Sequence, residues 1–131
     1  MDSEAPYRSL EVYKKAYQLA LEIHRLTLGF PKLEQFELAS QLRRSSKSIV
    51  VNLVEGMGRQ DHPAEVQRFV RIAIGSGDES RIWLDFAKDL KYLNDEDHQG
   101  LSSRLGEVGR MLRGVLNRYQ GIKELHQAKR R

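Results

Sequence analysis

The chain contains no cysteine, and this absence excludes several kinds of site at once. A disulfide scaffold, a zinc site built on thiolates and a cysteine nucleophile all need that residue. No segment approaches the roughly 18 uninterrupted apolar residues that suggest a membrane-spanning helix. Residues 1–15 carry acids where a secretory signal peptide has a basic region followed by an apolar run. We therefore expect a protein of the reducing cytoplasm that has no membrane partner.

Proline is scarce too, with three residues in 131, and no long stretch alternates polar and apolar residues as a strand does. Apolar residues instead recur every three or four positions over long runs, which is the period of an amphipathic α-helix. The chain is 40% hydrophobic and 31% charged, so it is apolar enough to bury a core. We expect a single domain over residues 1–131.

Four such runs predict four helices, and turn residues separate them. Gly29 and Pro31 end the first run and Gly58 follows the second, while Ser9 and Asp61 are the expected N-caps of the first and third helices. The predicted helices span residues 10–28, 33–56, 63–93 and 96–126. Because the connections are short, consecutive helices must be antiparallel. The predicted fold is all-α, an up-down-up-down four-helix bundle.

The third predicted helix has small residues at its centre, Gly75, Ser76 and Gly77. Either the helix breaks there, or the small residues allow a neighbouring backbone to approach closely. We favour the second reading, a continuous helix that a neighbouring backbone approaches closely, because the apolar period keeps its phase on both sides. Trp83 falls in that period and is expected to pack in the core.

The second predicted helix has an apolar face, expected to lie in the core, that is formed by Leu38, Leu42, Ile49 and Leu53. Polar residues recur at helical spacing beside this face. If this edge is buried, each polar group needs a hydrogen-bond partner, and the centre of the third helix can supply it. We interpret the set as a structural network or subunit contact and not as a catalytic site. Its predicted members are Gln41, Ser48, Asn52, Glu55, Ser76 and Glu79.

The net charge is +4, and basic residues gather on the second and fourth predicted helices. Binding to nucleic-acid phosphates needs several positive charges on one side of a protein. The same residues could instead form a solvated face with local ion pairs, such as one between Glu55 and Arg59, which lie four residues apart. The candidates for nucleic-acid contact are Arg43, Arg44, Lys47, Arg59, Arg110, Arg113 and Arg118.

No sequence pattern points to catalysis or to a bound cofactor. The glycines at 56 and 58 follow a helix and lack the rest of a dinucleotide fingerprint, and no Walker sequence occurs. No glutamate is followed by histidine three residues later, as a di-metal bundle requires. We therefore predict a protein that is not an enzyme and has no metal site and no cofactor.

Several short motifs occur in a familiar order. They are Phe-Pro at 30–31, LASQLRRS at 38–45, NLVEG at 52–56 and LKYL at 90–93. With these motifs the chain resembles, over residues 10–116, the four-helix-bundle proteins encoded in intervening sequences of bacterial 23S rRNA genes. That family also includes the accessory variability proteins of diversity-generating retroelements. Val54 and residues 77–78 and 80–81 depart from the usual pattern.

The resemblance implies a homopentameric barrel with a basic surface. In the retroelement branch it also implies binding of nucleic acid and of a partner reverse transcriptase. The intervening-sequence branch has no settled biochemical activity. The alternative function is therefore a structural bundle that docks on a protein partner, for example of the ribosome, without binding nucleic acid directly.

Overall fold

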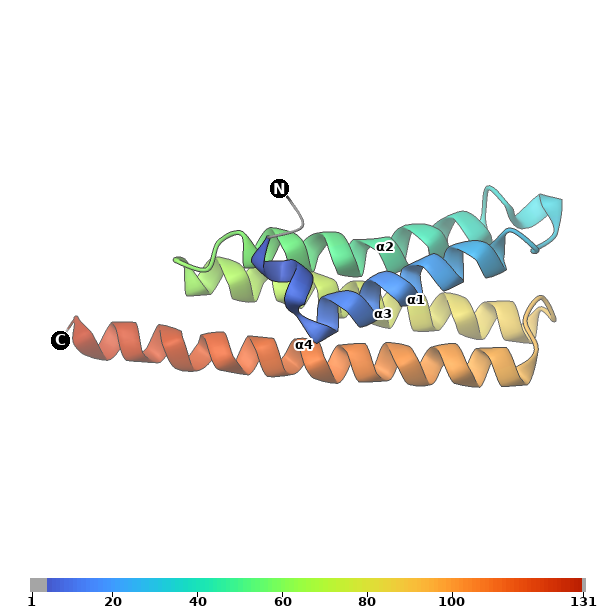
Figure 1. Cartoon of the computed structure of the whole chain (residues 1–131). Coiled ribbons are helices and arrows are strands. Elements are labelled where there is room, and N and C mark those ends of the chain that lie inside the picture. Colours follow the sequence, from blue (N-terminus) through green and yellow to red (C-terminus); the bar gives the residue numbers. More distant parts are fainter. Residues whose placement is uncertain (1–4, 131) are drawn as a thin grey trace.

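The computed structural model describes residues 5–130 and contains four long helices. They are α1 (Glu11–Thr27), α2 (Leu38–Met57), α3 (Pro63–Asp89) and α4 (Asp95–Lys129). Two short 3-10 turns, η2 (Pro6–Ser9) and η3 (Lys32–Glu34), precede α1 and α2, and no strand occurs in this part of the chain. Successive helices run in opposite directions (Figure 1). The predicted all-α, up-down-up-down bundle is confirmed.

The helices pack as neighbours in chain order. Helix α2 contacts α1 and α3, and α4 contacts α3 extensively and α1 to a smaller extent. Helix α4 is the longest, at 35 residues, and its C-terminal turns project beyond the loop between α2 and α3 (Figure 1). The α3–α4 pair therefore forms one long face of the molecule.

The core is a continuous apolar layer to which every helix contributes. Burying one aliphatic side chain of this size stabilises a fold by roughly 1.5–3 kcal/mol, so the layer supplies the main driving force for assembly of the bundle. The apolar positions predicted for the second helix lie in it. The most deeply buried members include Leu19, Ile23, Leu42, Ile49, Leu53, Val66, Val70, Leu84 and Leu112.

Two predicted helix ends were wrong. Helix α2 begins at Leu38 and not at residue 33, because the residues before it form η3 and a turn. The Gln35 side chain fixes this turn by donating to the carbonyl oxygens of Thr27 and Phe30, both at 2.9 Å. Helix α3 ends at Asp89 and not at residue 93, since Lys91 adopts a left-handed conformation (φ 68°) that no helix can continue through.

Two predicted caps were also wrong. Leu10 occupies the N-cap of α1, and the Ser9 hydroxyl instead donates to the Pro6 carbonyl within η2 (3.0 Å). His62, not Asp61, is the N-cap residue of α3, and it makes no capping bond through its side chain. The start of α4 has a side-chain cap, since Asn94 Oδ1 accepts from the backbone N–H of Asp97 (2.7 Å).

Helix α3 is continuous through its central glycines, as predicted. A Cβ placed on Gly77 would lie 3.7 Å from the Ile49 side chain, whereas one placed on Gly75 would meet nothing within 4 Å. The close neighbour at this point is therefore a side chain of α2 and not its backbone, so the predicted close approach of a neighbouring backbone was wrong.

Candidate functional site

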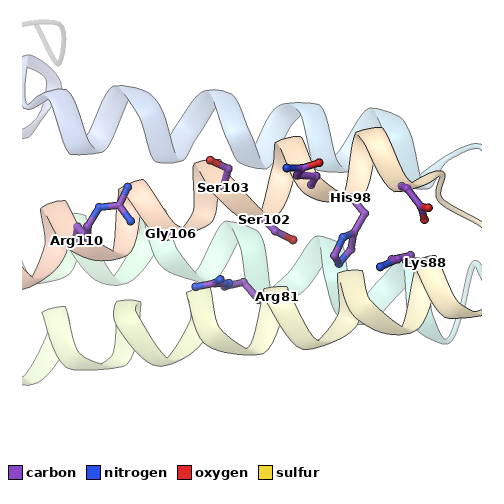
Figure 2. Close-up of a pocket in the computed structure, with 9 residues that line it drawn as sticks. Arg81, Lys88, His98, Ser102, Ser103, Gly106 and Arg110 are labelled. Carbon is purple, nitrogen blue, oxygen red and sulfur yellow. The ribbon is translucent and has the colours of Figure 1, made fainter.

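A groove of about 510 Å³ runs between α3 and α4, close to the loop that joins them (Figure 2). Both helices contribute basic side chains to it, and α4 also contributes two serine hydroxyls. We refer to it as the α3–α4 groove. It is lined by Arg81, Lys88, Asp95, His98, Gln99, Ser102, Ser103, Gly106 and Arg110.

Two arginines from different helices converge above a glycine in this groove. A Cβ added to Gly106 would lie 3.5 Å from a guanidinium nitrogen of Arg110 and 3.8 Å from one of Arg81. The missing side chain at 106 therefore leaves the space that both guanidinium groups occupy. Arg113 repeats the arrangement one turn later, where its guanidinium folds over Gly109 at 3.4 Å.

The cations of the groove have no carboxylate to neutralise them. Within residues 5–130, Arg81, Lys88 and Arg110 take part in no ion pair. The acid Asp95 also lines the groove but pairs with none of them. The side of the groove formed by these three residues is therefore a concentrated positive charge.

Two acids near the groove are held by other partners. Asp85 binds His98 Nε2 at 2.7 Å, and Glu107 binds Lys15 of α1 at 2.7 Å. The hydrogen bond from Lys15 is the main reason that the pKa of Glu107 is lowered, so this acid stays ionised and paired with α1. Neither carboxylate forms an ion pair with Arg81 or Arg110, although the charge of Arg110 contributes to the lowered pKa of Glu107.

The groove also holds a hydroxyl without a partner. Ser102 Oγ is inaccessible to solvent, and no atom of the described chain forms a hydrogen bond with it. Leaving such a group unsatisfied is unfavourable by about 1–3 kcal/mol. Because the atom lies beneath the surface, it can donate to a ligand with oxygen acceptors only if the side chain rotates into the groove. Arginine guanidinium groups beside a hydroxyl donor are suited to phosphate oxygens.

The basic residues predicted on α2 do not reach this groove, and most are engaged inside the chain. Arg43 donates to Thr27 Oγ1 (3.1 Å), Gln35 Oε1 (3.2 Å) and the Gln35 carbonyl (3.1 Å). Its guanidinium thus fastens the α1–α2 loop to α2. Lys47 Nζ lies 2.8 Å from His24 Nδ1, and its charge is the largest cause of the lowered pKa of that histidine.

The other two candidates on α2 differ from each other. Arg59 donates to the carboxylate (2.9 Å) and the carbonyl (2.7 Å) of Glu55, so the local ion pair anticipated from their spacing is present. Its guanidinium also lies over the Phe69 ring, 4.6 Å from the centroid. Arg44 is exposed and has no ion pair among the described residues.

The candidates on α4 follow the helix away from the groove. Arg110 lines it, Arg113 lies one turn beyond, and Arg118 packs over the Tyr119 ring at 5.5 Å. The α3 contribution, Arg81 and Lys88, was not predicted, because that helix carries acids and bases in nearly equal numbers. Their seven-residue spacing places them on one edge of α3, and this is the signal that could have identified them.

Part of the predicted polar network links α2 to α3. The hydroxyls of Ser48 and Ser76 lie 2.8 Å apart, and Asn52 Nδ2 donates to Ser48 Oγ at 3.0 Å. A second, buried pair joins the same helices where Ser45 Oγ lies 2.7 Å from Ser80 Oγ.

The remaining network candidates take no part in these hydrogen bonds between α2 and α3. Glu55 pairs with Arg59 just beyond the end of its own helix, Glu79 is exposed, and no hydrogen bond of the Gln41 side chain is present among the described residues. The polar network is therefore smaller than predicted and consists mainly of serines.

The described chain has neither a cluster of metal ligands nor a membrane-spanning helix. No cluster of three or more histidine and acidic side chains between residues 5 and 130 is placed to hold a metal ion. None of the helices in the same range combines the length and hydropathy needed to cross a bilayer.

The fold and the groove define a four-helix bundle with a basic cleft between its last two helices. Residues 8–114 match the family described as the 23S rRNA-intervening sequence protein, and the chain belongs to this family. The resemblance seen in its motifs is thereby confirmed.

A solved structure supports the same fold. It is a protein of unknown function from the S23 ribosomal protein family of Bacteroides thetaiotaomicron, with a TM-score of 0.74. The two chains are 22% identical over 81% of this chain and 95% of the other, a likeness that concerns the fold alone. A search of curated proteins gave no significant match.

Proposed function

We propose that this chain is a non-enzymatic, oligomeric, cytoplasmic accessory protein that binds the phosphate backbone of RNA or DNA in the α3–α4 groove. One observation carries the proposal. Arg81 and Arg110 converge from two helices over Gly106, Lys88 lies farther along the same groove, and none of the three forms an ion pair among the described residues.

The chemistry of the groove favours the nucleic-acid backbone over the bases. Cations that neutralise phosphates release condensed counterions, and this supplies affinity without sequence preference. Reading bases in single strands usually needs aromatic side chains for stacking, and no aromatic residue lines the groove. Binding is therefore expected to depend steeply on salt and weakly on sequence.

Assembly would multiply this weak contact. The homopentamer implied by the family resemblance would carry five copies of the groove, and linked sites gain avidity without any new contact. In the retroelement branch of the family, such a ring would hold a nucleic acid for a partner reverse transcriptase. In the intervening-sequence branch it would hold RNA.

A second candidate function is a bundle that contacts protein partners only. It is favoured by Leu33 and Phe36, which are 81% and 89% exposed in the loop between α1 and α2. Apolar side chains this exposed on one loop suit a protein partner, such as a reverse transcriptase or a ribosomal protein.

Fluorescence anisotropy with short RNA and duplex DNA at two salt concentrations tests the proposal. We expect binding at low salt, and we expect Arg81→Glu combined with Arg110→Glu to abolish most of it and to reduce the salt slope by about two. Lys32→Glu, at an exposed position in η3, reverses one charge far from the groove and is the control.

Two outcomes would contradict the proposal. One is the absence of binding to either nucleic acid at low salt, which would favour the protein-contact function. The other is equal loss of binding in the control and in the groove variants, which would indicate a diffuse charge effect instead of a site.

A further inference from the structure

An apolar groove of about 290 Å³ lies between α1 and α2, on a different face from the basic groove. Its lining is almost entirely carbon, and Lys47 is its charged member. Val51 is 57% exposed and Tyr17 is 44% exposed, so the groove is open to solvent in the single chain. We refer to it as the α1–α2 groove; it is lined by Tyr17, Ala20, Leu21, Lys47, Val50 and Val51.

A second apolar surface lies on the outer side of α3. We define the α3 ridge as Ile72, Ile82, Phe86 and Leu90, each between 41% and 53% exposed. The last three repeat every four residues, so they follow one edge of the helix. Trp83 flanks the ridge, with its ring 5.9 Å from that of Phe86 and its indole Nε1 buried without a hydrogen-bond partner.

Acidic residues border the ridge. Asp78, Glu79 and Asp89 are exposed, and none of them forms an ion pair within residues 5–130. Arg71, next to Ile72, is a charge of opposite sign on this side of α3. The acids outnumber it, so the surface around the ridge is negative.

Basic residues border the α1–α2 groove. Lys47 lines it, Arg44 lies one turn before Lys47 on α2, and Arg25 lies one turn after Leu21 on α1. Neither arginine forms an ion pair among the described residues. The groove and the ridge therefore match in apolar character and are opposite in charge.

We propose that the occupant of the α1–α2 groove is the α3 ridge of a second copy of this chain. Within one chain α3 packs against α2 and α4, and its ridge faces away from the core, so it cannot reach its own groove. The groove is lined by residues 17–21 of α1 and 47–51 of α2, a length of about 6 Å at a rise of 1.5 Å per residue. The step from Ile82 to Phe86 covers the same distance, so the groove is long enough for two consecutive side chains of the ridge.

This contact is heterologous, because each copy offers its groove to one neighbour and its ridge to another. Repetition of such a contact closes a ring when the rotation permits. The inference rests on the self-assembly part of the proposed function, which it deepens by naming the two surfaces. It does not depend on nucleic-acid binding, since the α3–α4 groove uses a different edge of α3.

A pair of complementary variants tests the contact. Val51→Glu places an acid in the groove opposite the acidic ridge, and Phe86→Lys places a base on the ridge opposite the basic groove. Both positions are about half exposed, so each variant is expected to keep its helical circular dichroism. Leu125→Glu and Leu125→Lys, at a 55% exposed position of α4 outside both surfaces, are the matched controls.

We expect light scattering during size exclusion to give an oligomer for the wild type and for both controls, and a monomer for each test variant. An equimolar mixture of the two test variants keeps one intact groove and one intact ridge. At the other contact the two substituted surfaces now carry opposite charges and no longer repel each other. The mixture should therefore form oligomers again, although each variant alone is monomeric. This recovery is specific to a heterologous contact.

Several results would overturn the inference. They are a wild type that is monomeric at tens of micromolar, test variants that keep the wild-type mass, controls that dissociate as well, and a mixture that stays monomeric. Both test variants keep Arg81 and Arg110, so anisotropy with a short oligonucleotide measures the basic groove separately. Loss of nucleic-acid binding with assembly intact would count against the proposed function alone.

Discussion

Adjacent arginines on α2 have different roles because their side chains leave the helix in different directions. Arg43 is partly buried and forms three hydrogen bonds to the end of α1 and the following loop, whereas Arg44 is exposed and unpaired. Both were nucleic-acid candidates on the basis of charge. The direction in which a side chain leaves the helix decides whether an arginine holds the structure together or is free to contact a partner, and the charge alone does not distinguish the two.

This difference predicts unequal effects of alanine at the two positions. Arg43→Ala leaves the buried Thr27 hydroxyl and the Gln35 side chain without their charged donor and should lower the free energy of unfolding by about 1–3 kcal/mol. Arg44→Ala should change it by less than about 0.5 kcal/mol. Urea denaturation followed by circular dichroism measures both, and equal effects would contradict the structural role of Arg43.

A lysine and a histidine that meet between α1 and α2 predict a pH effect. The charge of Lys47 is the largest cause that lowers the pKa of His24 from its ordinary value of 6.5, with burial second. The unfolded chain therefore takes up this proton more readily than the folded chain, and the contribution to stability is lost as pH falls below about 6.5. Lys47→Met should raise the pKa of His24 and reduce this loss.

An NMR titration of the His24 ring in the wild type and in Lys47→Met measures the shift directly. Lys14→Met, which removes another lysine from the α1 side of the molecule, is the control. An unchanged or lower pKa in Lys47→Met would show that the ammonium group does not set the protonation of this ring.

At the scale of the elements, the sequence predicted the four helices and their core positions better than it predicted the helix ends. The apolar period identified all four helices and placed Leu42, Ile49 and Leu53 in the core. It failed where a bond from a distant side chain decides the boundary, as Gln35 does before α2, and where a single left-handed residue, Lys91, stops α3. Neither cause changes the apolar period of the sequence, so neither could be predicted from it.

The groove shows the same limit. Arg110 and Arg113 were candidates because they lie three residues apart on one helix, but Arg81 and Lys88 belong to a helix that carries acids and bases in nearly equal numbers. Only the pairing of α3 with α4 brings cations of both together. Their role in nucleic-acid contact stays a prediction.

Glycines at helix contacts and on open faces should respond oppositely to alanine. A Cβ at Gly56 would lie 3.2 Å from Phe69 Cβ and 3.4 Å from the Val66 carbonyl, and both atoms are fixed by the α3 backbone. Gly56→Ala should therefore destabilise the bundle. Gly114→Ala meets nothing within 4 Å and should stabilise it by about 0.5–1 kcal/mol, the gain in helix propensity. Thermal unfolding of both variants tests the sign of each effect.

At the scale of the whole molecule, stability should decline along α4 towards its C-terminus. The last strong ties to the other helices are Tyr119, which donates to Gln60 (3.0 Å), and Gln120, which accepts from the buried Gln67 (2.8 Å). Beyond residue 123 the described side chains are exposed. The helix is thus held by packing over its first 26 residues or so and is weakly tied after that.

Two truncations test this gradient. Removal of residues 123–131 should change the free energy of unfolding by less than about 1 kcal/mol, although four basic residues and one acid are lost and the net charge falls from +4 to +1. Removal of residues 117–131 also deletes Tyr119 and leaves Gln67 unsatisfied, and it should cost several kcal/mol, as large aromatic deletions do. Denaturant unfolding measures both, and similar losses would place the end of the stable bundle elsewhere.

The chain has one tryptophan, and it stands beside the α3 ridge. Its intrinsic fluorescence therefore belongs to a single, known position. When a neighbouring copy covers Phe86, the indole loses its remaining water and its emission should move to shorter wavelength, whereas events in the α3–α4 groove leave its surroundings unchanged. The wavelength of this emission, measured while the unlabelled protein is diluted, should therefore follow the assembly of the ring.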